Sequence, residues 1–413
     1  MKERQSLRSS FSFTRLLACS FLLAAALRIG LALTFEEKLY WPDSNWYFDT
    51  AERIVAGQGF GQSLTRGPVY AYFLSFILLF SSRLLVIRIC ESVLSAFGCV
   101  LVGLIGKRLF SEKVGLLAAF VSSVYPYFVY LPSAQGSENI VSVLLLVSIL
   151  FLVGNGISLS LRNSILSGFF LGLSLLARPS MSAIVPGILV WPAFLGRSNE
   201  RTTLFRNVLI AVAVSLMTVV PWTVHNYVAT GQLVFIATSG GKQFWYGNNP
   251  YSTGSTTEIP AYPPELMQKL VTLPDDASRE RLLYKEGLEF IRLHPKAALK
   301  LYLVRLANLF QLYPSVNTSG AVPERPIART MVTLGSIILF VLAFLGAVLV
   351  LVKRNPATVL PLIILSYCLG SAVFLIAMRY RLPMDPYLIL LGSGALAFFL
   401  RWPSALGSSE SEG

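Results

Sequence analysis

The sequence predicts an all-α polytopic membrane protein, and three observations lead to this fold class. First, 54% of its 413 residues are apolar and only 13% are charged, against roughly a quarter charged in an average soluble domain. Second, runs of about 20 apolar residues recur about ten times, and each can cross a hydrocarbon core of about 30 Å as a helix. Third, the apolar residues are contiguous rather than alternating, which excludes an outer-membrane barrel.

The apolar runs predict ten transmembrane spans. They cover 14–34, 84–106, 114–131, 139–154, 163–177, 181–196, 207–224, 329–352, 357–378 and 384–401. An even number of spans puts both termini on one side of the membrane. Several clusters of basic residues in and before the short loops then fall on that side: Lys2, Arg4, Arg8, Arg15, Lys107, Arg108, Lys113, Arg197, Arg201, Arg206, Lys353 and Arg354. By the positive-inside rule we expect a cell (inner) membrane protein with cytoplasmic termini.

The positions of the basic residues account for the net charge without a nucleic acid partner. The positions of the cysteines likewise give no reason to expect a structural metal. A net charge of +13 would suggest nucleic acid on a soluble domain, but here the bases anchor loops. The four cysteines lie within apolar spans and lack CxxC spacing, so neither a disulfide framework nor a zinc site is expected.

Two segments on the opposite, outer side are too long to be simple connectors. We expect residues 1–413 to form a single membrane-embedded domain, with 36–83 as a first outer loop and 225–328 as a second. Apolar residues at helical spacing near 43–54, and the short apolar stretch 69–80, predict interfacial helices in the first loop. The second loop holds the turn-rich run SGGKQFWYGNNP and then helical patterns on both sides of His294-Pro295.

Ionisable residues gather where the spans meet these outer loops, which predicts a site on the outer face. Arg379 and Arg381 directly follow a predicted span, and two guanidiniums at that depth suit a phosphate because Arg is a planar, forked donor. Anchoring of the helix end is the alternative. Asp43 begins the first predicted surface helix, where it is a candidate general base. An N-cap is the alternative, and the residue pattern alone favours the cap.

Five segments together resemble a known family. They are PDSNWYFDTAERIVAGQGF with TRGPVYAYFLSFILLF, then GFFLGLSLLARPS, PWTVHNYVATGQLVFIATSGGKQFWYGNNP, LHP and RYRLPMDPYLILL. In this order they resemble the polyprenyl-phosphate-dependent glycosyltransferases of GT-C fold, in the protein O-mannosyltransferase and aminoarabinose-transferase-like group. The resemblance implies a GT-C-like bundle of about ten transmembrane helices. It also implies an enzyme that moves a sugar from a polyprenyl-phosphate donor to a glycolipid, polysaccharide or protein acceptor at the outer face.

The resemblance also implies roles for individual residues. Asp43 matches the acidic residue that serves as catalytic base or orients the acceptor. The expected lipid-phosphate ligands are Arg379, Arg381, Arg66 and Arg178, and the further expected substrate contacts are Tyr47, Glu138, His225, Lys242, Asn248 and Tyr380. Two departures from the family stand out: His225 replaces the usual Arg of the Pro-Trp motif, and Ser44 follows Asp43 where mannosyltransferases have a second acid. No metal or other cofactor is required, and a divalent cation at Asp43 is left open.

Two other functions remain open on the sequence. A transporter or flippase of lipid-linked sugars should show paired broken spans and charges near the bilayer midplane. The nearest such charges here are Arg28, Arg88 and Glu91, of which the last two have the i,i+3 spacing of a pair. An O-antigen ligase or polymerase would share the lipid-linked donor and place basic residues in a late outer loop.

Overall fold

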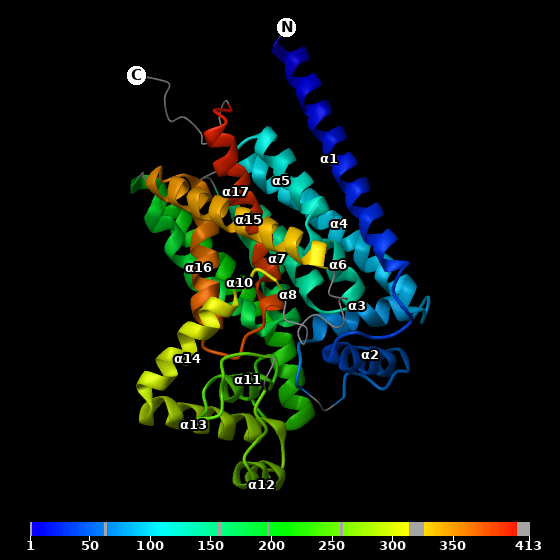
Figure 1. Ribbon diagram of the computed structural model, residues 1–413, viewed down its shortest axis with the longest axis vertical. Helices are drawn as coiled ribbons and strands as arrows, with labels where there is room; N and C mark the ends of the chain where they lie inside the picture. Colours follow the sequence, from blue (N-terminus) through cyan, green and yellow to red (C-terminus); the bar gives the residue numbers. More distant parts are fainter. Residues whose placement is uncertain are drawn as a thin grey trace.

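A bundle of long helices forms the body of the protein (Figure 1). The computed structural model describes residues 2–61, 64–154, 159–195, 198–256, 259–313 and 326–402, and its regular elements within these ranges are helices. The bundle helices are α1 (Lys2–Ala32), α4 (Leu84–Leu109), α5 (Glu112–Val124), α7 (Glu138–Val153), α8 (Leu161–Ala177), α10 (Ser198–Thr230), α15 (Pro326–Val352), α16 (Val359–Ser371) and α17 (Asp385–Phe399). The all-α class expected from the sequence is confirmed.

Each predicted span coincides with helical structure, although the helices differ in length. Five are long and apolar enough to cross a membrane: Ser12–Ala32, Leu84–Leu109, Arg201–Thr230, Arg329–Val352 and Met378–Phe399. A sixth forms if α5 and α6 (Pro126–Ala134) act as one span bent by 52°. The predicted span 114–131 thus corresponds to two helices with a bend between them, because Pro126 cannot continue the backbone hydrogen bonds of α5. The remaining four predicted spans are helical segments of fewer than 18 residues.

One of these shorter segments is interrupted by prolines. The predicted span 181–196 is a 3-10 turn (η1, Pro179–Ile184), a short helix (α9, Val185–Val190) and a second 3-10 turn (η2, Trp191–Phe194). Each begins at or next to a proline, and proline both lacks an amide donor and restricts the residue before it. The segment still runs alongside the bundle, where it packs against α16.

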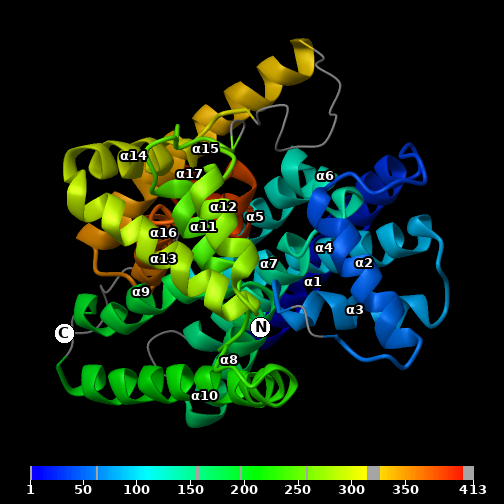
Figure 2. The same cartoon turned by 90° about the horizontal axis from the view of Figure 1, so that it is seen from below.

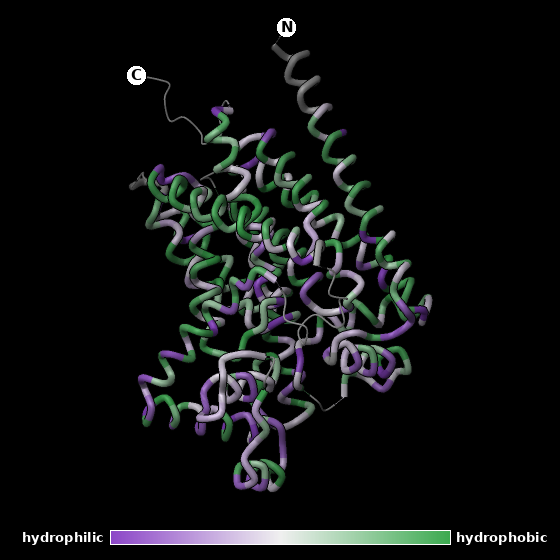
Figure 3. Tube along the Cα trace, viewed as in Figure 1, coloured by the Kyte–Doolittle hydropathy of each residue, from purple (hydrophilic) through white to green (hydrophobic). Residues whose placement is uncertain are grey.

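The two predicted outer segments both lie at the end of the bundle opposite the termini. Helices α2 (Pro42–Val55) and α3 (Pro68–Leu78) come from the first. The second supplies α11 (Gly240–Gly247), α12 (Pro264–Thr272), α13 (Asp276–Leu293) and α14 (Pro295–Asn308). Figure 2, which looks at this end, shows the two groups over different parts of it. The hydrophilic residues of Figure 3 are concentrated there, while the bundle is mostly hydrophobic.

A buried arginine, Arg28, connects helices inside the bundle by hydrogen bonds. Arg28 of α1 is fully buried and donates to Ser95 Oγ at 2.9 Å and to the carbonyls of Ser122 and Ser123 at 3.1 and 3.0 Å. Its charge thus meets a hydroxyl of α4 and two backbone carbonyls of α5, which satisfies a group that would otherwise be costly to bury.

The pair expected between Arg88 and Glu91 does not form. Arg88 donates to the carbonyl of Lys38 at 2.8 Å. Glu91 instead accepts from the Tyr70 hydroxyl and, at 3.4 Å, from the Asn139 amide. Both side chains therefore have structural partners in neighbouring segments, because packing of α3 and α7 brings other groups closer than the i,i+3 neighbour.

The second outer segment docks on the chain just before Arg379. Arg305 of α14 is buried and donates to the carbonyl of Ala372 at 2.7 Å, to that of Gly247, and to Asn248 Oδ1 at 3.1 Å. A backbone bond of 2.9 Å joins the Leu375 amide to the Gln243 carbonyl. These contacts fix the backbone that leads into η5 (Met378–Met384).

Candidate active site

Five charged side chains meet at the end of the bundle opposite the termini, which we call the outer end after the predicted outer segments, and each comes from the end of a different element. Asp43 lies in the first turn of α2, and Glu138 is the first residue of α7. Arg66 precedes α3, Arg178 directly follows α8, and Arg379 lies in η5. We call these five residues the charge cluster. Helix ends suit such a site because their positions are rigid while their side chains reach beyond the helix.

Asp43 is the centre of the charge cluster. Its Oδ1 lies 2.7 Å from an Nη of Arg66, and its Oδ2 lies 2.7 Å from an Nη of Arg379. These are short charge-assisted hydrogen bonds to both oxygens. The second predicted role of Asp43, as an N-cap, finds no support, because the cap position of α2 is Trp41 and makes no side-chain cap bond.

Glu138 forms the second centre of negative charge. Its Oε1 lies 2.6 Å from Arg178 Nη1 and 3.7 Å from Arg379 Nε. Arg379 therefore bridges the two carboxylates. With a side-chain exposure of 3% for Glu138 and 15% for Arg178, this pair is shielded from water, where ion pairs are strong and separation is costly.

Aromatic rings support the three arginines. The guanidinium carbon of Arg178 lies 4.3 Å from the centre of the Tyr380 ring, and that of Arg379 lies 4.8 Å from the Trp41 ring. Arg66 lies 5.6 Å from the ring of Tyr47. Cation–π contacts at these distances orient each guanidinium while leaving part of its donor edge for other partners.

Two glycines allow the segments to approach closely enough. A Cβ on Gly67 would lie 1.9 Å from the carbonyl oxygen of Leu176, so the backbone beside Arg66 touches the end of α8 beside Arg178. A Cβ on Gly136 would lie 2.3 Å from the Trp41 ring and 2.4 Å from Glu138 Oε2. Any larger residue at either position would push apart the elements that carry the charges.

The arginines outnumber the acids, and this decides the electrostatics of the site. Burial by itself would raise the pKa of Asp43, but the charges of Arg379, Arg66 and Arg178 outweigh it and hold the pKa below its usual value. By formal charge, three guanidiniums stand against two carboxylates. The charge cluster carries one positive charge in excess, in a partly dry site that favours a bound anion.

The residues fit an anion better than a divalent cation. Both oxygens of Asp43 and Oε1 of Glu138 already face guanidiniums, which would repel a metal ion bound between them. Within the described ranges no three His, Cys, Asp or Glu side chains come together as a ligand set. We therefore derive no step of the chemistry through a metal.

Four predicted site residues lie apart from the charge cluster, and Arg381 is the most informative of them. It is 1% exposed and pairs with Asp385, which is 0% exposed, at 2.8 Å, and it also donates to the Leu309 carbonyl at 2.8 Å. Tyr125 donates to the same aspartate at 2.8 Å. Arg381 is thus committed to joining η5, α17 and α5, and the structure does not place it where it could meet a phosphate.

Asn248, Lys242 and His225 are also held elsewhere. Asn248 is buried, and its amide donates to the carbonyls of Phe244 and Val373 at 2.8 and 2.9 Å. Lys242 is exposed, 5.7 Å from the Tyr246 ring. His225 is exposed and stacks on Trp222 at 4.6 Å. These three residues therefore lie outside the charge cluster, and their expected contacts with substrate stay predictions.

Conversely, the structure brings Trp41 and Gln135 to the site, where sequence reasoning did not place them. Trp41 is buried beneath Arg379, and its position two residues before Asp43 was the available signal. Gln135 is buried with a positive φ of 57°, and its carbonyl accepts from the Ser44 hydroxyl at 2.7 Å. No local pattern predicts that this turn meets α2.

The fold is that of the GT-C membrane glycosyltransferases. The oligosaccharyltransferase of Archaeoglobus fulgidus tethered to an acceptor peptide containing the NVT sequon superposes with a TM-score of 0.58 at 15% identity, covering 98% of this chain and 52% of that one. The same enzyme (AglB) with an inhibitory peptide and a dolichol-phosphate gives 0.54 at 15% identity, covering 98% and 53%. The chain thus spans about half the length of these two oligosaccharyltransferase chains, and it has the polytopic, all-helical fold expected.

The sequence itself also matches a family. Residues 65–225 match the family described as dolichyl-phosphate-mannose-protein mannosyltransferase. The structure of ArnT from Cupriavidus metallidurans bound to undecaprenyl phosphate is also similar, with a TM-score of 0.46 at 13% identity, covering 94% of this chain and 77% of that one. No curated protein matches the chain in sequence. The resemblance to polyprenyl-phosphate-dependent glycosyltransferases is confirmed by the family match together with the fold.

Proposed function

We propose that the protein transfers a sugar from a polyprenyl-phosphate carrier to a hydroxyl or amine of an acceptor on the outer face of the cell membrane. One observation carries this proposal: three arginines and two carboxylates meet at the outer end of the bundle with one positive charge in excess. A sugar phosphodiester carries one negative charge, so its charge matches that excess. The matched family is named for a dolichyl-phosphate-linked sugar, and a solved structure of the same fold holds dolichol-phosphate.

The chemistry is a single displacement at the anomeric carbon. The acceptor oxygen or nitrogen forms a bond to that carbon while the bond from the carbon to the phosphate oxygen breaks, and the electron pair stays on the phosphate. The lipid product is a phosphomonoester, whose charge rises toward −2 because its second pKa is about 6. Arg379, Arg66 and Arg178 stabilise this growing charge.

Asp43 draws the proton from the acceptor. When a phosphate binds, Arg66 and Arg379 can turn part of their donor edge toward it, which frees an oxygen of Asp43 for the acceptor O–H or N–H. The pKa of Asp43 is low, so the proton passes to the departing phosphate, which is the stronger base and releases it to water at neutral pH because its second pKa is about 6. Asp43 thus both relays the proton of the acceptor and orients the acceptor group.

The decisive experiment compares the native chain with Asp43→Asn in nanodiscs. Both receive radiolabelled polyprenyl-phosphate sugars and an envelope extract, and release of the free lipid phosphate is followed. We expect the native chain to consume a donor and the variant to bind it with turnover reduced about 100-fold or more. A native chain that consumes no donor but moves labelled lipid between leaflets of vesicles would overturn the proposal in favour of a transporter.

A further inference from the structure

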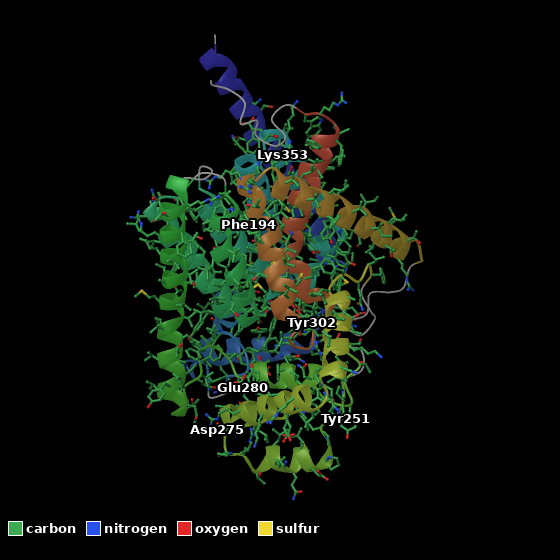
Figure 4. All side chains as sticks on the ribbon, turned by 90° about the vertical axis from the view of Figure 1, so that its left-hand side faces the viewer. Phe194, Tyr251, Asp275, Glu280, Tyr302 and Lys353 are labelled. Carbon is green, nitrogen blue, oxygen red and sulfur yellow. The ribbon has the colours of Figure 1, made fainter. Side chains whose placement is uncertain are left out.

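A cavity lies at the outer end of the molecule, separate from the charge cluster. It has a volume of about 410 Å³ and is bounded by the first outer segment, the end of α10 with the loop after it, and the start of α13. Its lining includes Leu64, Thr230, Val234, Asp275, Asp276 and Arg279. In Figure 4, Asp275 lies near the outer end of α10, far from Lys353 at the opposite end of the bundle. Such a volume is within the range of about 300–1,000 Å³ usual for ligand sites.

The first outer segment contributes both to the lining of the cavity and to the charge cluster. The amide of Thr238 donates to the carbonyl of Leu64 at 2.7 Å, and Leu64 stands two residues before Arg66. Two residues span at most about 7 Å of chain. Leu64, Val234 and Ala277 pack together as a small buried cluster, so one wall of the cavity is well ordered. A molecule seated there would lie on the approach to Asp43 from the second outer segment.

The lining favours hydroxyl and amine donors over anions. Arg279 is the only base among the described lining residues, and its donors are engaged with Asp276 at 3.0 Å and with the carbonyls of Leu270 and Leu273 at 3.1 and 3.0 Å. Asp275 caps α13: its carboxylate accepts from the Ser278 amide at 2.7 Å, which holds its pKa below the usual value. The carboxylates of Asp275 and Asp276 keep acceptor lone pairs beyond their contacts with Ser278 and Arg279, whereas the donors of Arg279 are already engaged.

We propose that this cavity is the acceptor subsite and that it takes an uncharged or amine-bearing sugar unit of a glycoconjugate. The inference rests on the function proposed above and adds the chemical class of the acceptor. The charge cluster has a positive excess and suits the donor phosphate, whereas the cavity has a negative excess and repels it. Hydroxyls and ammonium groups can donate to the free carboxylate lone pairs, and the apolar wall covers the face of a sugar ring.

Two variants with matched controls test the subsite. Ala277→Phe fills the cavity, and Ala298→Phe adds the same bulk at an equally buried position on α14 outside it. Asp276→Asn removes one carboxylate charge without added bulk, and Glu286→Gln does the same at the surface pair with Lys269. Thermal unfolding of each full-length protein verifies that it is folded, so Asp276→Asn keeps the test valid should Ala277→Phe fail to fold.

Binding is measured by calorimetry with a glucosamine disaccharide, with its neutral diacetyl form and with glucose 6-phosphate. We expect both disaccharides to bind the native chain, to lose about tenfold or more in affinity in Ala277→Phe, and to bind both controls normally. Loss of affinity in Asp276→Asn is expected to be largest for the amine form, and glucose 6-phosphate is expected to bind about tenfold more weakly than either disaccharide. The KM for the lipid donor should stay within about twofold of native in both cavity variants.

The outcomes separate the two proposals. Equal sugar binding by native and Ala277→Phe protein, or preferential binding of the phosphate sugar, overturns the subsite while donor consumption by the native chain still supports the transferase. A native chain that consumes no donor contradicts the transferase and, with it, the assignment of the cavity to an acceptor, whatever its sugar binding.

Discussion

Asp43 shows how one carboxylate is kept ionised in a partly dry site. Each oxygen meets a guanidinium at 2.7 Å, and the combined charge of three arginines outweighs burial. Its position in the chain resembles that of a helix cap, but the structure gives it two ion pairs. The pKa and the contacts of this residue lead to two predictions at the scale of single side chains.

The first prediction concerns the pH dependence of the rate at which the enzyme consumes its lipid donor. Because the pKa of Asp43 is held below its ordinary value of 3.8, the ionised form persists as the pH falls, and the acid limb of kcat/KM should lie below 3.8. Arg66→Gln removes one favourable charge, so the limb should move to higher pH. The profile is measured between about pH 3 and 8 in nanodiscs. If the acid limb of the kcat/KM profile lies at the same pH in Arg66→Gln as in the native chain, a group other than Asp43 is titrating.

The second prediction concerns the planar guanidinium group of Arg379. This side chain reaches Asp43 and Glu138 and stacks on Trp41, and a lysine ammonium can reproduce only one of these contacts at a time. Arg379→Lys should raise the KM for the lipid donor about tenfold or more. The exposed Lys296→Gln serves as the control and should leave the KM unchanged. An unchanged KM in Arg379→Lys would contradict a phosphate role for this residue.

At the scale of elements, the site depends on how closely helix ends approach each other. The segment before α3 touches the end of α8 through backbone atoms at Gly67 and Leu176, which sets Arg66 and Arg178 on the same side of Asp43. Helix α14 and α11 in turn hold the backbone that leads to Arg379. Neither contact involves a residue that would touch a substrate.

Gly67→Ala tests this packing. The new methyl would meet a backbone carbonyl that cannot rotate away, so α3 or α8 must shift, at a cost of about 1–3 kcal/mol in the free energy of unfolding. Gly30→Ala on α1, where nothing lies within 4 Å, is the matched control and should be neutral or slightly stabilising. Thermal unfolding in detergent measures both. Equal stability of the two variants would show that the contact is not tight.

At the scale of the whole molecule, the polar and basic groups are divided between the two ends of the bundle. Lys353 lies at the end that carries the termini, and Tyr251 and Asp275 lie at the other (Figure 4). With the positive-inside rule, this arrangement predicts that the charge cluster and the cavity lie outside the cytoplasm.

Labelling in intact cells tests this orientation. Tyr251 is 61% exposed, so Tyr251→Cys should react with a membrane-impermeant maleimide added outside. Lys353→Cys should react only after the membrane is permeabilised. The parent chain with its four native cysteines gives the background. The reverse pattern would place the proposed chemistry in the cytoplasm.

The sequence by itself determined the class of the protein and predicted where its charged residues gather. Long apolar runs leave a helix as the only way to satisfy the backbone in lipid, so the spans could be predicted from composition, and charges that are costly in lipid had to collect at the span ends. Asp43, Arg66, Glu138, Arg178 and Arg379 could therefore be predicted as site residues from their positions together with the family resemblance.

Only the tertiary structure decided which of these charges meet. Arg379 and Arg381 are chemically equivalent in the sequence, yet one faces Asp43 and the other is buried against Asp385. The bend at Pro126, the approach at Gly67 and the turn at Gln135 that meets Ser44 join segments far apart in the chain. Such contacts depend on side-chain packing between helices, which a local pattern of hydrophobicity and charge does not encode.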